Sequence, residues 1–316
     1  MTAAKSLTIC TVSFGHGALI ELNLQLARAQ NPQFDTQAVW QIADNAPIKS
    51  EQRIVLADPS VVISTGACDT SQGASHHHAL ALNALVGAVD TRFLLVLDPD
   101  FYLLMPNWIE RVLGHMQAHQ LAFFGAPWHP RYNRNYRYFP AVHCMFVDLE
   151  RVERDALDFR PRLDLIEPPL SHRTGWLDRL PFLWRRKRVA WDTGVQVHAR
   201  FAETTRAQCV TPVFRQSSEA PVGFKTRLIE ALLPDAYCYT PKRKGSYTER
   251  GFCESGACPH PLPALWEETL WDNEPFGLHV RRSYAAHGRN ENDEWRTLLG
   301  ALDSLTARGR KAGLTR

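Results

Sequence analysis

The first half of the chain alternates between short apolar runs and longer segments whose apolar residues recur at helical spacing. Helical spacing extends over residues 18–30 and 75–89, and a further helix is expected to begin near Pro106. The apolar runs predict six buried strands, at residues 7–14, 38–42, 61–64, 92–97, 121–126 and 141–147. Strands that alternate with helices are typical of an α/β fold, in which helices cover both faces of a mostly parallel sheet.

The alternation weakens after residue 150. Residues 161–181 are rich in proline and charge, and residues 234–263 combine proline, glycine, cysteine and charged residues. We therefore expect three parts along the chain: a regular α/β half over 1–150, an irregular second half over 151–306, and a flexible basic tail over 307–316.

Composition narrows the class of protein. Of the 316 residues, 45% are hydrophobic and 22% charged, which is ordinary for a globular protein and argues against disorder. Lysine and arginine number 36 against 33 acidic residues, so the net charge of +3 argues against a nucleic-acid partner. The sequence shows neither an apolar run long enough to span a membrane nor a signal peptide, and its 7 cysteines are irregularly spaced, so we expect a cytoplasmic protein.

The strongest chemical signal follows the strand at residues 92–97. Asp98 and Asp100 flank Pro99, which stiffens the turn. In parallel sheets, ligands bind at the carboxyl ends of the strands. Two carboxylates at such an end can hold magnesium or manganese, and the metal would in turn bind a diphosphate. The alternative is a polar turn that binds no ligand.

The first 150 residues resemble the nucleotide-sugar-binding half of the GT-A glycosyltransferases, most closely those of family 2. The resemblance rests on the strand at 8–14, the pair Asp44-Asn45, the helix at 75–83 and the segment 93–100. It implies a Rossmann-like GT-A sheet and an acceptor-binding second half. It also implies transfer of a sugar from a nucleotide-sugar donor to a saccharide or lipid-linked acceptor, as in the synthesis of cell-surface polysaccharides or glycoconjugates.

The resemblance also implies roles for individual residues. Asp98 would face the ribose or metal-bound waters, Asp100 would ligate the metal, and Asp44 would hydrogen-bond the nucleobase. Phe14 and Asn83, which belong to the matching strand and helix, are expected to contact the donor as well.

A histidine from the second half is expected to complete the metal site. Several GT-A enzymes use a C-terminal histidine in this way, and His279 lies in an apolar stretch that is followed by Arg281 and Arg282. Imidazole suits manganese, and either arginine, by preference Arg281, could pair with the diphosphate. The alternative is a buried core histidine followed by surface arginines.

The catalytic base has no family motif to mark it, because the acid pair and the tryptophan motif of family 2 are both missing. We select Asp192, which precedes a helix expected over residues 195–201 and could equally serve as its N-terminal cap. Asp164, Glu167 and Asp178 are its rivals. Whether the reaction inverts or retains configuration therefore stays open.

Three other segments carry weaker signals. Residues 180–188 place aromatic side chains beside four cations, which would suit peripheral contact with the inner face of a membrane, or simply an exposed loop. Residues 131–139 alternate arginine with aromatic residues, which suits a loop near the donor. The consecutive histidines at 76–78 cannot all ligate one ion from a helix, and we expect them near the donor sugar.

Three other function classes stay open. An NAD(P)-dependent oxidoreductase is suggested by Gly15 and Gly17 after the first strand, but Ile20 occupies the place of the third glycine. A nucleotidyltransferase would also use paired aspartates, but the glycine-rich signature loop of that class is missing. A non-catalytic carbohydrate-binding protein with this fold would bind its ligand without turnover.

Overall fold

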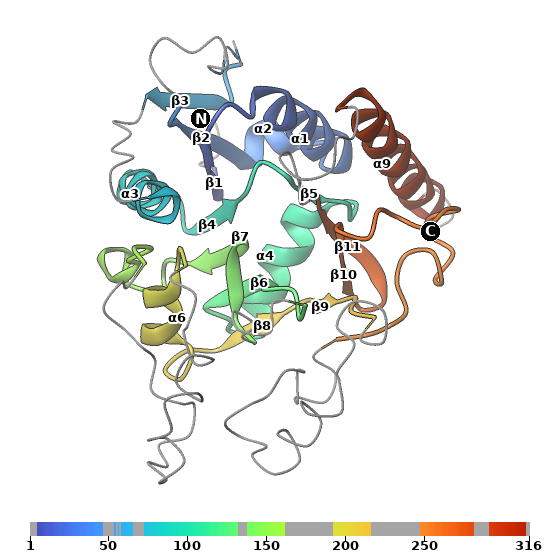
Figure 1. Ribbon diagram of the computed structural model, residues 1–316. Coiled ribbons are helices and arrows are strands. Elements are labelled where there is room, and N and C mark those ends of the chain that lie inside the picture. The colour runs from blue at the N-terminus through green and yellow to red at the C-terminus, as the bar shows by residue number, and fades with distance from the viewer. Residues whose placement is uncertain are drawn as a thin grey trace, which may run out of the picture.

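The computed structural model describes residues 5–46, 54, 56, 58–65, 73–131, 138–161, 192–215, 247–280 and 291–313. Their strands form two sheets, of seven and four strands, which lie side by side (Figure 1).

The larger sheet consists mainly of the strands that the sequence predicts. Its order is β3 (Val61–Thr65), β2 (Ala38–Asp44), β1 (Leu7–Ser13), β4 (Phe93–Leu97), β7 (Pro140–Asp148), β6 (Phe123–Pro127) and β8 (Ala207–Cys209). The first four strands pair in parallel, β7 runs antiparallel to both β4 and β6, and β8 is parallel to β6. Only β7 therefore opposes the others, which confirms the mostly parallel sheet.

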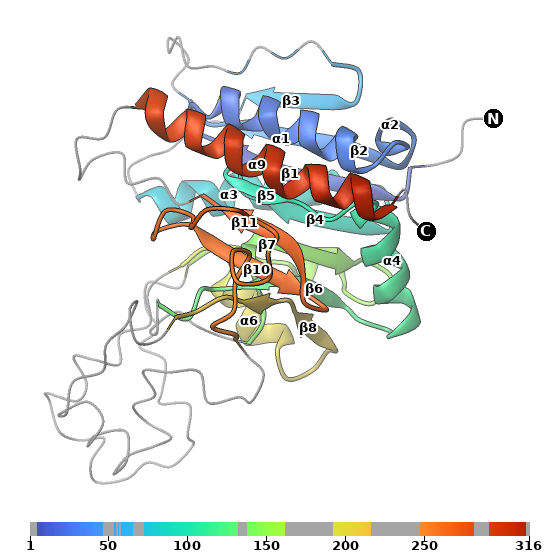
Figure 2. The same ribbon diagram turned by 90° about the vertical axis from the view of Figure 1, so that its right-hand side faces the viewer.

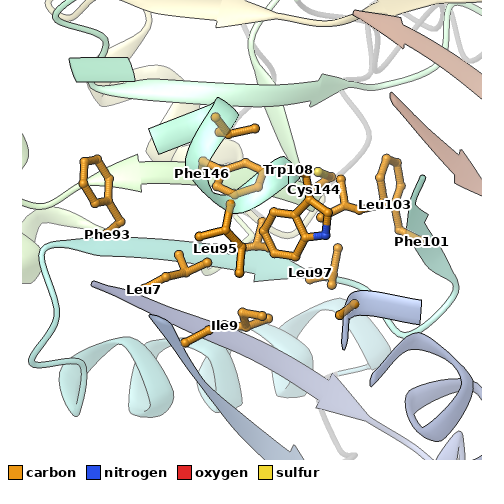
Figure 3. Close-up of a cluster of buried hydrophobic side chains, with 14 of the residues drawn as sticks. Leu7, Ile9, Phe93, Leu95, Leu97, Phe101, Leu103, Trp108, Cys144 and Phe146 are labelled. Atoms are coloured by element: carbon orange, nitrogen blue, oxygen red, sulfur yellow. The ribbon is translucent and has the colours of Figure 1, made fainter. Parts of the chain in front are cut away.

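Helices cover both faces of this sheet, as expected. On one face lie α1 (Gly17–Gln30), α2 (Phe34–Gln37) and α4 (Trp108–Ala118), and on the other α3 (Ala74–Gly87), α6 (Val195–Phe201) and the 3-10 turn η2 (Arg154–Ala156). Side chains alternate along β4, so that Leu95 and Leu97 join the core beneath α1 and α4 while Leu94 and Val96 pack towards α3. Figure 3 shows the first of these cores, with Trp108 over Leu95 and Leu97.

The smaller sheet is antiparallel and combines distant parts of the chain. Its order is β5 (Phe101–Leu103), β11 (Glu274–His279), β10 (Glu267–Trp271) and β9 (Thr211–Pro212). The long helix α9 (Glu291–Gly313) closes its outer side, where Leu298 and Leu302 share a core with Leu278 of β11 and Leu19 of α1. Figure 2 shows α9 running alongside α1.

The second half is more regular than its composition suggests. Its β8 and α6 join the larger sheet, β10 and β11 form a hairpin, and α9 extends to Gly313, into the segment expected to be a flexible tail. None of the described helices is long and apolar enough to cross a membrane.

Candidate functional site

A cavity of about 410 Å³ opens at the carboxyl ends of β1 and β4. This is the edge of the sheet at which parallel strands bind ligands. Phe14 and Trp128 contribute aromatic surface to its walls. Apolar residues such as Val12, Leu19 and Val142 also line it. The polar and charged residues of the lining include Ser13, His16, Asn45, His77, His78, Asp98, Asp100, His143, Asp192 and Thr193.

The turn that carries the two aspartates is held by backbone hydrogen bonds to both sheets. The Asp98 amide donates to the His143 carbonyl on β7, at 3.1 Å. The Val280 amide donates to the Asp100 carbonyl at 2.9 Å, which ties the turn to the end of β11. The Phe101 amide closes the turn by donating to the Asp98 carbonyl at 3.1 Å. The backbone positions of both aspartates are therefore fixed by the two sheets.

The smaller sheet brings His279 to this turn. His279 pairs with Phe101 on one neighbouring strand and with Glu267 on the other. Its Nε2 lies 3.4 Å from an Asp100 oxygen, and its Nδ1 lies 3.0 Å from Glu267 Oε2. One ligand atom each from Asp98, Asp100 and His279 lie within 4.8 Å of one another, and this is the metal-compatible cluster within the described part of the chain. Two carboxylate oxygens and one imidazole nitrogen fit manganese, or magnesium with its preference for oxygen.

Two histidines of the site, His279 and His78, differ in the charges around them. Burial lowers the pKa of His279, but the carboxylates of Asp100 and Glu267 outweigh it and raise that pKa to about 9. For His78, burial lowers the pKa although Asp98 lies 3.9 Å away. At neutral pH, His279 therefore carries a proton that balances the carboxylates, whereas His78 is neutral and can act as a hydrogen-bond partner for a ligand.

Stacked rings hold the His279 imidazole from its face. The His143 ring stacks on it at 4.7 Å between centroids, with 23° between the planes. Phe101 stacks on His143 at 5.6 Å, and Trp128 meets the edge of His143 at 5.7 Å. The rings thus connect the candidate metal site to the Trp128 wall of the cavity.

At the opposite wall, the structure places Asn45 where the sequence predicts Asp44. Asp44 is buried, and its two oxygens accept hydrogen bonds from the backbone amides of Ala46 and Ile54, at 3.0 and 3.1 Å. Asn45 lines the cavity instead, and so does His77, whose ring lies 5.9 Å from that of Phe14. Within the described ranges, Asn45 Oδ1 and His77 Nδ1 are buried without a hydrogen-bond partner. Because buried polar atoms nearly always have a partner, both atoms are candidates for contact with a bound ligand.

Two further predicted residues fall on different sides of the cavity boundary. Asn83 lies outside the lining: its amide nitrogen donates to Asp158 and its oxygen accepts from the Phe159 amide. Asp192 lines the cavity. The N-cap of α6 is Gly194, with no side-chain capping bond, so Asp192 does not cap that helix.

Several predictions concern residues outside the described ranges. These are the diphosphate-binding Arg281 with Arg282, the rival bases Asp164, Glu167 and Asp178, the segment 180–188, and residues 132–137 of the arginine-aromatic loop.

Comparison with known proteins gave structural similarity only. No protein-family profile matches the sequence, and neither does any curated protein sequence. TarS 1–349 of S. aureus is 11% identical over 49% of this chain, with a TM-score of 0.34, and this chain spans about half of its length, 50%. The mannosyltransferase PcManGT from Pyrobaculum calidifontis, in complex with GDP-Man and Mn²⁺, is 13% identical over 66% of this chain and 55% of its own, with a TM-score of 0.40.

A third similar structure is the galactosyltransferase LgtC in complex with donor and acceptor sugar analogs. It is 10% identical over 78% of this chain and 88% of its own, with a TM-score of 0.38. PcManGT and LgtC are thus glycosyltransferases, the class that the sequence resembles.

Sequence reasoning missed Glu267, His143 and Asn45. Asp272 and Asn273, both with positive φ, of 51° and 64°, form the two-residue loop of the β10–β11 hairpin, so the sequence carried a signal for the hairpin but none for the β-bulge that brings Glu267 opposite His279. Such a loop places residues before it opposite residues after it. His143 and Asn45 had no comparable signal, because their roles depend on the neighbours of each strand end.

Proposed function

We propose that this protein is a glycosyltransferase, which moves a sugar from a nucleotide-sugar donor to a saccharide or lipid-linked acceptor with the help of bound manganese or magnesium. The observation that carries the proposal is the convergence of Asp98, Asp100 and His279, with ligand atoms within 4.8 Å, at the wall of a cavity of about 410 Å³. The cavity is within the usual size range for small-molecule sites, roughly 300–1,000 Å³.

Different walls of the cavity would bind different parts of the donor. Asp98, Asp100 and His279 would hold the cation, which supplies positive charge to stabilise the departing diphosphate. Away from the cation, Phe14 is 43% exposed and would stack its ring on the nucleobase. Asn45 would offer its unpartnered amide oxygen. The donor-binding role expected of Asp44 thus passes to its neighbour.

Asp192 is the residue of the lining that we assign to the acceptor. In an inverting reaction, the bond from the sugar C1 to the diphosphate oxygen breaks, the acceptor oxygen bonds to C1, and the acceptor proton moves to the Asp192 carboxylate. In a retaining reaction, Asp192 would position the acceptor. Catalysis by Asp192 predicts that Asp192→Asn lowers kcat without weakening donor binding.

The proposal is tested by thermal-shift measurements with nucleoside diphosphates, nucleotide sugars and NAD(P), each with and without Mn²⁺. A ligand at about 100 times its Kd adds about 2.7 kcal/mol of stability. We expect a shift that requires both one nucleoside diphosphate and Mn²⁺, and release of that diphosphate on turnover. A metal-independent shift with NAD(P) would identify an oxidoreductase, pyrophosphate release a nucleotidyltransferase, and binding without turnover a carbohydrate-binding protein.

The proposed location is the cytoplasm, with peripheral contact at the inner membrane face through residues 180–188. The basis is the aromatic and basic composition of that segment, which would bring the cavity to a lipid-linked acceptor. Sedimentation with anionic vesicles, compared with neutral ones, tests this contact, and equal binding to both would contradict it.

A further inference from the structure

Glu267 is a buried carboxylate next to the candidate metal site. Glu267 is 2% exposed, and its Oε2 lies 3.0 Å from Nδ1 of His279. A carboxylate at such depth is costly unless a charged or hydrogen-bonding partner compensates it. The His279 imidazole compensates this carboxylate, and it is also the nitrogen donor of the cluster.

We propose that Glu267 is a positioning residue, which fixes the tautomer and the ring direction of His279 so that Nε2 presents its lone pair to a divalent cation between Asp98 and Asp100. The inference rests on the function proposed above and deepens its metal site. Cation binding releases the Nε2 proton of His279 to solvent. Because Glu267 accepts from Nδ1–H, the remaining proton of the neutral imidazole stays on Nδ1. Nε2, which faces Asp100 at 3.4 Å, is then the nitrogen that binds the cation. Metal-binding histidines in general use their second ring nitrogen in this way.

The strand register places Glu267, His279 and Phe101 directly opposite one another on three neighbouring strands. Glu267 on β10 lies directly opposite His279 on β11, which in turn lies opposite Phe101, the residue after Asp100. Residues that are directly opposite in a sheet project from the same face, with Cβ atoms close together. The contact between Glu267 and His279 is therefore dictated by strand pairing.

A β-bulge in the hairpin makes this pairing possible. Next to the turn, Trp271 pairs with Glu274 and Leu270 with Pro275, but Thr269 pairs with Gly277, so one residue of β11 is left over. If the two strands kept the register of the turn without a bulge, His279 would face Trp266, and Glu267 would face Leu278. Bulges commonly re-aim side chains next to functional sites. Here the bulge aligns the carboxylate with the imidazole.

The next residue, Glu268, provides a matched control. It is also buried, but its carboxylate projects from the other face of β10. There it contacts Arg215 at 3.2 Å and accepts a hydrogen bond from the Phe252 amide. Glu267 and Glu268 thus share chemistry, strand and burial, and differ in their contact with His279.

The test measures the binding of Mn²⁺ alone, without nucleotide, to the full chain at fixed pH by electron paramagnetic resonance. Glu267→Gln is expected to weaken Mn²⁺ binding by about 10–100-fold, because the amide can also donate to Nδ1 and thereby stabilise the tautomer with the proton on Nε2. Glu268→Gln, if folded, is expected to bind Mn²⁺ like the wild type, even if it melts at a lower temperature. Equal Mn²⁺ affinity of wild type and Glu267→Gln would overturn the inference.

A measurement on the wild type covers the case in which a variant does not fold. In the Mg²⁺-loaded protein, nitrogen NMR of His279 is expected to show a protonated Nδ1 and an unprotonated Nε2; the opposite tautomer would overturn the inference. If Asp100→Asn abolishes Mn²⁺ binding but Glu267→Gln binds Mn²⁺ like the wild type, the proposed function stands and the role of Glu267 fails. If the wild type does not bind Mn²⁺, both fail.

Discussion

The two sheets reach the candidate site by different routes. The larger sheet contributes Asp98 and Asp100 directly after β4, and the strands β1 to β4 follow one another along the chain, with helices between β1 and β2 and between β3 and β4. The smaller sheet contributes His279 and collects strands from residues 101–103, 211–212 and 267–279. The metal-binding cluster therefore lies at the junction of a locally built sheet and one built from long-range pairings. Its geometry is correct only when both are in register.

The largest effect is expected from removing the charge at this junction. Asp100→Asn takes away a metal-binding carboxylate, and we expect turnover to fall by more than about 100-fold, because the cation contributes several kcal/mol to transition-state stabilisation. The stimulation by Mn²⁺ should disappear while circular dichroism stays unchanged. Near-normal turnover would contradict the assignment of the cluster. Arg28, which pairs with Asp35 and Asp58 far from the cavity lining, offers a control position in Arg28→Lys.

The pairing between the sheets can be disturbed without touching a ligand. A Cβ on Gly277 would lie 2.6 Å from the Phe101 ring, so that Gly277→Val must displace this ring, which packs against His279, or move β11 away from β5. Such overpacking costs about 1–3 kcal/mol. We also expect Mn²⁺ binding to weaken, because His279 is two residues away on the same strand.

The matched control is Gly114→Ala in α4, where a Cβ would meet nothing within 4 Å. A helical alanine is expected to raise stability by up to about 1 kcal/mol and to leave Mn²⁺ binding unchanged. Equal Mn²⁺ affinity in both variants would show that the site does not depend on the β5–β11 pairing.

Within the larger sheet, substitutions of two neighbouring residues at the end of β2 are expected to affect different properties, stability for Asp44 and nucleotide binding for Asn45. Asp44→Ala removes the acceptor for two backbone amides and should lower the free energy of unfolding by about 1–3 kcal/mol. Asn45→Ala removes a cavity-lining acceptor and should weaken nucleotide binding by about tenfold with little loss of stability. Calorimetric titration and denaturant unfolding of both variants would separate the roles, and the reverse pattern would restore Asp44 as the donor contact.

The smallest effect is a pH dependence of the metal-free protein. His279 has a pKa of about 9 in the folded chain, above its ordinary value of 6.5, so the folded state binds the proton more tightly than the unfolded state. This stabilisation is complete below pH 6.5 and is lost as the pH rises through about 9. The melting temperature should therefore decline across that interval, and His279→Gln should flatten the decline. An equal decline in both proteins would assign it to other groups.

The sequence predicts most of the larger sheet because its signals are local. The strands at residues 7–14 and 92–97 and the helix at 195–201 are confirmed with small shifts at their ends, since each carries its own apolar pattern. The three-residue β5 and the two-residue β9 are too short for such a pattern. They exist because β10 and β11 pair with them.

The same distinction holds within the candidate site. Asp98, Asp100 and His279 were predictable because a strand-end acid pair and an isolated histidine in an apolar stretch are visible in sequence, and the structure brings them together. Asp44 and Asn83 were expected at the donor, but their partners, the Ile54 amide and the loop at Asp158, depend on the path of the chain. Sequence spacing does not reveal such contacts.

The position of His279 near the end of the described chain has a consequence for biosynthesis. The ribosome synthesises Asp98 and Asp100 long before β11. At about 5–20 residues per second, the interval between the two is roughly 10–40 s. During this time the acid pair lacks its imidazole, and the strand that orients the turn has not been made. A nascent or prematurely terminated chain would therefore lack the complete cation site, and the ability to retain the cation would appear late, when the final hairpin joins β5.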